Sequence, residues 1–211
     1  MRRLLTTLIG AAALLGACRP AAKPAADSTV QQDLVTPAQL AMFAPLPVAM
    51  PSPDNPMTPA KVDLGRRLYY ETALSEDHQM SCNSCHALTG YGVDNRQFST
   101  GFKGQLGGRN APTVYNAAAH VAQFWDGRAP TVEEQAKGPI LNPVEMAMPN
   151  SNEVIKHLKA NPTYVRAFQA AFPGEKEPVN YDNLGKAIGA FERGLVTPSR
   201  WDAYLKGDKT A

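Results

Sequence analysis

The stretch Cys82-Asn83-Ser84-Cys85-His86 is a C-x-x-C-H run, and the rest of the chain is interpreted around it. Two thiols at this spacing can each add to a vinyl group of haem, and the histidine that follows can ligate the iron. If a helix begins here, residues three apart share one face, so both sulfur atoms reach one porphyrin edge. A redox dithiol would need a strand–helix–strand context, and a zinc site would need another Cys/His pair; the sequence shows neither. We therefore interpret Cys82, Cys85 and His86 as the site of one covalent haem c.

The N-terminus has the form of a secretion signal. Two arginines precede an apolar run from Leu4 to Leu15, and Leu15-Gly16-Ala17-Cys18 is a small-residue cleavage site that ends on cysteine. Residues 1–17 therefore resemble a bacterial lipoprotein signal peptide. This pattern predicts a periplasmic protein that is held to a membrane only through lipid on Cys18. An ordinary signal peptide with an incidental cysteine is the alternative.

Residues 18–35 are rich in Ala, Pro, Ser and Gln, and we interpret them as a flexible tether to a domain over residues 36–211. If one thiol carries lipid and two carry haem, none of the three cysteines remains for a disulfide. The formal charge of +2 falls to 0 without the two N-terminal arginines. This charge balance excludes a basic nucleic-acid-binding protein.

Composition favours helices over sheets. The chain of 211 residues carries 18 prolines and 16 glycines, as expected for short helices joined by long ordered loops. A Gly-rich stretch, residues 89–108, shows neither the apolar spacing of a helix nor the alternation of a strand. A loop of this length inside a compact domain is usually functional, so we predict a functional loop. The expected fold class is all-α, a cytochrome c-like haem domain. Apolar spacing and capping residues predict helices over residues 38–43, after Thr58-Pro59, and over residues 132–137, 153–160, 162–171 and 183–195.

Further short strings form an ordered pattern along the chain. They are Leu64-Gly65 through Leu74-Ser75, Ser81 to His86, Arg109-Asn110-Ala111-Pro112-Thr113, Phe124-Trp125-Asp126-Gly127-Arg128, Glu134-Gln135-Ala136 with Gly138-Pro139, Asn142-Pro143-Val144-Glu145-Met146, Lys186-Ala187-Ile188 and Leu205-Lys206-Gly207-Asp208. From about Pro37 onward the chain resembles the bacterial di-haem cytochrome c peroxidases and their methylamine-utilisation maturation relatives. The resemblance implies reduction of hydrogen peroxide to water, with electrons from a small periplasmic cytochrome c or cupredoxin, and a homodimeric assembly.

The same resemblance implies roles for individual residues. His86 matches the proximal ligand of the peroxidatic haem iron, and Glu145 with Gln135 matches the polar groups where peroxide binds. Trp125 matches the tryptophan between two haems. Asn110 matches a ligand of a calcium ion at the domain interface. Without the family, each residue except His86 has an ordinary structural interpretation as a loop acid, a helix-surface amide, a core aromatic or a turn former.

Two features depart from the family's pattern. In many members the Gly-rich loop supplies a histidine that caps the iron at rest, whereas this chain has Phe102 in that register. We therefore expect this haem to lack the cap. Members also carry another C-x-x-C-H run in a C-terminal, electron-accepting domain, and no second run occurs before Ala211.

Other ligands of the iron give other functions. A thioether from Met146 or Met148 would make the protein a mono-haem electron carrier. His120 lies near Trp125 but is flanked by alanines, which is more typical of a packed core histidine. Haem-dependent protein modification, as in the maturation relatives, is a third reading that shares the fold.

Overall fold

The computed structural model describes residues 36–211, and the regular structure in this range is helical. Apart from two isolated bridges, Thr100 with Leu106 and Gln123 with Ala129, these residues form no strand. The predicted all-α class is therefore confirmed. The predicted signal peptide, Cys18 and the tether lie outside the described residues. Within the described range, no helix is long and apolar enough to cross a membrane.

The helices fall into two units. A short N-terminal unit ends at Met42 and includes α1, whereas the unit Phe43–Ala211 contains all other described helices. The α-helices are α1 (Pro37–Leu40), α2 (Pro59–Tyr69), α3 (Cys82–Cys85), α4 (Val132–Leu141), α5 (Ser151–Ala160), α6 (Pro162–Ala171), α7 (Tyr181–Glu192) and α8 (Arg200–Leu205). The short 3₁₀ helices are η1 (Thr72–Leu74), η2 (Leu88–Gly90), η3 (Phe102–Gly104) and η4 (Ala117–Ala119).

Side-chain caps fix where the longer helices begin. Thr58 accepts a hydrogen bond from a backbone N–H at the start of α2, and Thr131 does so for α4. Asn150, Asn161 and Asn180 play the same part for α5, α6 and α7. Each oxygen satisfies one of the N–H groups that a helix start leaves without a partner.

Several helix boundaries differ from the prediction: α1 is Pro37–Leu40 rather than residues 38–43, and α5 begins at Ser151 rather than at residue 153. Helix α4 continues to Leu141 although Pro139 lies inside it, so the Gly138-Pro139 pair does not end the helix. Helix α7 begins and ends earlier than predicted, at Tyr181 and Glu192. Helix α8 was not predicted, because six residues without an apolar period give little signal. Its capping box, Ser199 with Asp202, is the feature that could have revealed it.

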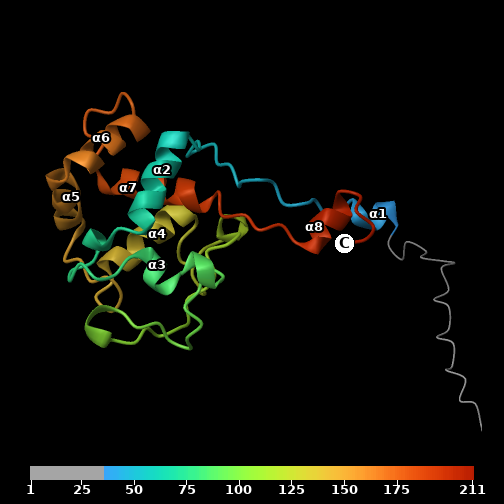
Figure 1. Cartoon of the computed structure of the whole chain (residues 1–211), viewed down its shortest axis with the longest axis horizontal. Helices are drawn as coiled ribbons and strands as arrows, with labels where there is room; N and C mark the ends of the chain where they lie inside the picture. Colours follow the sequence, from blue (N-terminus) through green and yellow to red (C-terminus); the bar gives the residue numbers. More distant parts are fainter. Residues whose placement is uncertain (1–35) are drawn as a thin grey trace, which may run out of the picture. The chain divides into compact units, whose positions relative to one another are not determined.

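The core forms where α7 packs against α2 and α4, while α6 packs against α2 (Figure 1). Leu64, Leu68 and Ile188 are fully buried at these contacts. Gly65 lies against the backbone of Ala187 so closely that a Cβ atom would collide with it. Near the C-terminal end of α7, Phe191 belongs to an apolar cluster against which Cys82 of α3 packs.

A buried ion pair ties α4 to the residue after α7. The Arg193 guanidinium donates to both Glu133 carboxylate oxygens, at 2.7 and 3.0 Å, and both side chains are buried. Asn55 donates a further hydrogen bond to Glu133 at 2.9 Å. Burial alone would raise the pKa of Glu133, but these hydrogen bonds hold it below its ordinary value. Removing one partner of such a pair would leave an uncompensated buried charge.

Candidate haem site

The C-x-x-C-H run forms a helical turn, as its spacing predicts. Ser81 is the N-cap residue of α3 and donates its backbone N–H to Ser84 Oγ at 3.0 Å, and the His86 N–H donates to the Cys82 carbonyl at 3.0 Å. The thiols of Cys82 and Cys85 are free, and both residues line the same cavity of about 360 Å³. Burial raises the pKa of the Cys82 thiol to about 12 and also raises the pKa of Cys85. The two sulfur atoms therefore face one cavity from one short helix.

His86 is oriented by backbone carbonyls. Its Nδ1 atom lies 3.0 Å from the Pro112 oxygen and 3.4 Å from the Gly92 oxygen. Because a carbonyl only accepts, Nδ1 carries the proton, and Nε2 is left with a free lone pair for a metal. Burial lowers the pKa of His86, which favours the neutral, ligating form. Tyr69 donates to the His86 carbonyl at 2.6 Å and anchors the same residue from α2.

The chemistry of the cavity walls fits a haem. Two thiols and one available imidazole nitrogen line the same cavity, and these are the groups that covalent attachment and axial ligation require. Much of the remaining wall is apolar, as expected around a flat hydrophobic macrocycle. The apolar lining comprises Ala111, Pro112, Val114, Ala117, Phe124, Ala136, Pro139, Val144 and Met146.

The two predicted peroxide-binding residues line this cavity as well. Gln135 projects from α4, and Glu145 lies in the turn that follows that helix. Asn142 donates to the Glu145 carboxylate at 2.9 Å, while no side-chain hydrogen bond engages Gln135 within residues 36–211. Burial raises the pKa of Glu145, an effect that Asn142 and the charge of Arg128 partly offset. The structure thus brings a carboxyl group and a free amide to the cavity that holds the C-x-x-C-H side chains.

Trp125 and Asn110 lie together at the cavity rim. The Trp125 indole N–H donates to the Asn110 backbone oxygen at 2.9 Å, and 60% of Trp125 is exposed. Both residues line the cavity. The predicted calcium ligand Asn110 stays a prediction; in the described part of the chain, no group of three or more His, Cys, Asp or Glu side chains could hold a metal ion.

Comparisons with known proteins agree with this geometry. The family described as di-haem cytochrome c peroxidase matches residues 59–210. The chain is 46% identical over 173 residues to cytochrome c551 peroxidase of Pseudomonas aeruginosa, covering 81% of this chain and 50% of that relative. It is 42% identical over 168 residues to cytochrome c peroxidase Ccp of Escherichia coli, covering 79% of this chain and 34% of that relative.

The chain belongs to the di-haem cytochrome c peroxidase family. A solved structure of a MauG-like protein associated with microbial copper homeostasis matches it with a TM-score of 0.70 and 36% identity. The match covers 77% of this chain and 48% of that structure, and it confirms the predicted cytochrome c-like fold. The chain spans half or less of the length of these relatives.

Several charged residues that line the cavity were not predicted from the sequence. Arg109 and Arg128 both line the cavity and both pair with Asp126, at 3.1 and 2.8 Å. Glu192, at the end of α7, also lines it although only 5% of the residue is exposed. Arg109 and Arg128 each lie in a string that resembles the family, which could have drawn attention to them. The apolar spacing of α7, in contrast, indicated ordinary core packing at Glu192.

The Gly-rich loop meets the Glu145 turn through its backbone. The Phe102 N–H donates to the Glu145 carbonyl at 2.8 Å. Gly101 packs against the Val144 carbonyl where a Cβ atom would collide, so this contact requires glycine. Gly101 lines the haem cavity, whereas Phe102 is not among the described residues that line it. The loop therefore supports the backbone of the turn that carries Glu145.

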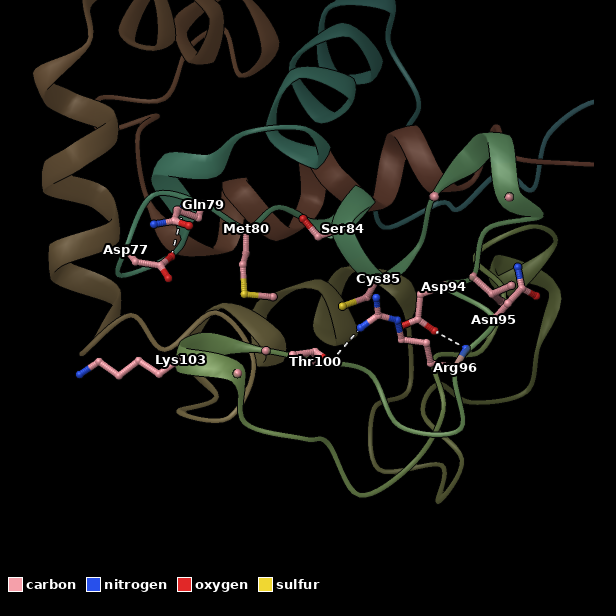
Figure 2. Close-up of a pocket in the computed structure, with 15 residues that line it drawn as sticks. Asp77, Gln79, Met80, Ser84, Cys85, Asp94, Asn95, Arg96, Thr100 and Lys103 are labelled. Atoms are coloured by element: carbon pink, nitrogen blue, oxygen red, sulfur yellow. Dashed lines mark hydrogen bonds between the residues drawn. The ribbon is translucent and has the colours of Figure 1, made fainter.

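A second hollow lies beside the haem cavity. This groove has a volume of about 710 Å³ and shares Met80, Cys85 and Gly101 with the cavity. Figure 2 shows Met80 and Cys85 between Asp77 on one side and Asp94 with Arg96 on the other. The Arg96 guanidinium donates to the Thr100 hydroxyl at 2.9 Å. The Cys85 side of the site thus opens toward a polar groove.

The other candidate ligands of the iron, Met146, Met148 and His120, lie in three different environments. Met146 is buried and lines the cavity, whereas Met148 is fully buried in the helical core and does not appear among the described lining residues. His120, predicted to be packed in the core, is exposed, so that prediction is wrong. The residue follows the single turn of η4, and the alanines around it do not form a buried helix.

Proposed function

We propose that the chain forms the peroxidatic haem domain of a cytochrome c peroxidase that reduces hydrogen peroxide to water. The observation that carries this proposal is the meeting of two sets of residues in one cavity. Cys82, Cys85 and His86 provide attachment and ligation, and Glu145 with Gln135 provides acid–base and hydrogen-bonding groups. Family membership supports the assignment.

Cys82 and Cys85 would hold the haem through thioether bonds, and Nε2 of His86 would ligate its iron. Bound haem would supply an iron that coordinates peroxide and exchanges electrons. The hydrogen bond from His86 Nδ1 to the Pro112 carbonyl holds the imidazole ring and increases its basicity as a ligand. The apolar walls would keep bulk water away from the reacting atoms.

Glu145 would move the proton. Its carboxylate accepts a proton from the near oxygen of peroxide and returns it to the far oxygen, which leaves as water. Asn142 holds one carboxylate oxygen, which limits rotation of the group. Gln135 offers amide N–H donors that can orient peroxide. A pKa raised by burial suits this role, because proton transfer in both directions works best when the pKa lies near the operating pH.

The remaining assignments support the same activity. Trp125, at the cavity rim, would carry electrons arriving from a second haem, with a small cytochrome c or cupredoxin as the donor. Asn110 would ligate a calcium ion near this rim. The N-terminal sequence supports a periplasmic protein anchored by lipid on Cys18, and a homodimer is the assembly that we propose from the family resemblance.

An electron carrier is the second candidate, because Met146 is buried and lines the haem cavity beside Glu145. Its thioether as sixth ligand would exclude peroxide. Haem-dependent protein modification is another, supported by the match to a MauG-like protein. We favour the peroxidase because the carboxyl group and the amide would have no task in a carrier.

Spectroscopy of the oxidised holoprotein separates the peroxidase from the carrier. Because the phenyl ring of Phe102 cannot ligate iron, we expect high-spin or water-ligated haem that binds cyanide without prior reduction. Magnetic circular dichroism and resonance Raman spectra report this ligation directly. A histidine–methionine signature that disappears in Met146→Ala would contradict the peroxidase and establish the carrier.

A further inference from the structure

Glu192 is a buried carboxyl group without a partner. It is the last residue of α7, only 5% of it is exposed, and it lines the haem cavity. Within residues 36–211 no hydrogen bond and no ion pair engages its side chain. Glu133, the nearby buried acid, differs because Arg193 and Asn55 satisfy it. A buried acid without a donor is costly when ionised, so its presence in a haem cavity requires an explanation.

The titratable groups around Glu192 show which side chain in this part of the cavity can change protonation near neutral pH. Tyr69 comes from α2, and burial raises its pKa far above the usual range. Cys82 comes from α3, and its sulfur would have no proton to exchange once it forms a thioether bond to haem. Glu133 comes from α4 and stays ionised beside Arg193. Burial, together with the charge of Glu133, raises the pKa of Glu192 to about 8. Among these described groups, Glu192 is therefore the one that changes protonation near neutral pH.

We propose that Glu192 is the proton-exchange group of the haem cavity: its carboxyl group binds a proton from solvent when a one-electron reductant reduces the iron, and releases it on oxidation. This proposal rests on the proposed haem site at Cys82, Cys85 and His86. Each reduction adds one electron to the iron and one proton to Glu192. The net charge of the enclosed cavity then stays constant.

The physical reason is electrostatic. A nearby positive charge favours the ionised carboxylate, and the cavity loses one positive charge when the iron is reduced. The pKa of Glu192 must then rise, so the reduced protein binds the proton more tightly than the oxidised protein. Thermodynamic linkage requires the midpoint potential to fall as the pH rises between the two pKa values. The limit is about 59 mV for each tenfold change in proton concentration when one proton accompanies one electron.

The test is a spectroelectrochemical titration of the holoprotein from about pH 6 to about pH 9, a range that brackets a pKa near 8. Glu192→Gln keeps the size of the side chain and removes the proton site, so we expect the slope of potential against pH to decrease. Glu145→Gln is the matched change at another cavity carboxyl group, and Glu153→Gln is the matched change at a half-buried α5 residue that does not line the cavity. The proposal requires a larger decrease in Glu192→Gln than in either control.

A wild-type slope in Glu192→Gln, or an equal loss in Glu145→Gln, would overturn the proposal. Haem retained after acid–acetone extraction shows whether the site itself is correct. A wild-type protein without covalent haem overturns the haem assignment, whereas normal haem with a flat slope overturns only the role of Glu192. If Glu192→Gln does not retain haem, redox-difference infrared spectra of the wild type decide. A protonated-carboxyl band that grows on reduction and shifts in Glu192→Asp supports the proposal, and its absence overturns it.

Discussion

The helical layer of α2, α4 and α7, from which α4 and α7 line the haem cavity, and the loop wall of residues 86–131, which also lines it, are held together by different physical means. The helical layer is held by fully buried apolar side chains such as Leu68 and Ile188. The loop wall is held by backbone hydrogen bonds and by side chains that bond to its backbone, such as Thr113 and Tyr115, and it contains non-glycine residues with positive φ, among them Tyr91, Asn116 and Phe124. The comparison shows that apolar burial supplies the frame, while the irregular backbone orients His86 through the Pro112 carbonyl and places Trp125 beside Asn110.

The largest effect should come from the thiols that join the haem to both regions. In Cys82→Ala with Cys85→Ala we expect complete loss of covalent haem, and a less stable domain, because the cofactor would fill the cavity between the helices and the loop wall. Acid–acetone extraction followed by absorption spectroscopy measures the haem that remains. Haem recovered in wild-type yield from the double variant would remove the haem assignment.

A smaller effect is expected on the free energy of unfolding, and it should differ between the helical layer and the loop wall. Leu68→Ala removes a side chain that is 0% exposed in α2, and Leu106→Ala makes the same change where 63% of the residue is exposed in the loop wall. We expect Leu68→Ala to lower the free energy of unfolding by about 2–5 kcal/mol. The loop variant should change it by less than about 0.5 kcal/mol. Denaturant unfolding of both holoproteins, followed by circular dichroism, measures the difference; equal losses would show that the loop wall carries core packing too.

The same contrast explains what could be predicted from the sequence. Helix α6 was predicted with its observed bounds, because Pro162 follows a capping Asn161 and Phe172-Pro173-Gly174 ends the apolar period. Helix α4 was predicted too short, because a proline usually ends a helix and tertiary packing overrode that rule at Pro139. Local rules therefore work best where caps and apolar spacing agree.

The site was predictable to the extent that it is encoded locally. The C-x-x-C-H run places both thiols by one helical turn, as its spacing predicts, whereas the orientation of His86 also depends on the distant Pro112 carbonyl. Glu145 and Gln135 were expected from the family resemblance, and the fold brings them to the same cavity. Glu192 was missed because a helical period shows which residues are buried, but not whether they face packed side chains or a cavity.

The central claim is that Glu145 is the acid–base group of a peroxidase. Glu145→Gln keeps size and hydrogen bonding and removes the proton acceptor, so haem content should be unchanged. The reaction of the oxidised holoprotein with hydrogen peroxide, followed by stopped-flow absorption, should slow by roughly 10²–10⁴, the usual contribution of a positioned acid–base group. This half-reaction needs neither an electron donor nor a second haem, so it tests the site directly. A variant with full haem content that reacts at the wild-type rate would contradict the account and leave Glu145 without a catalytic role.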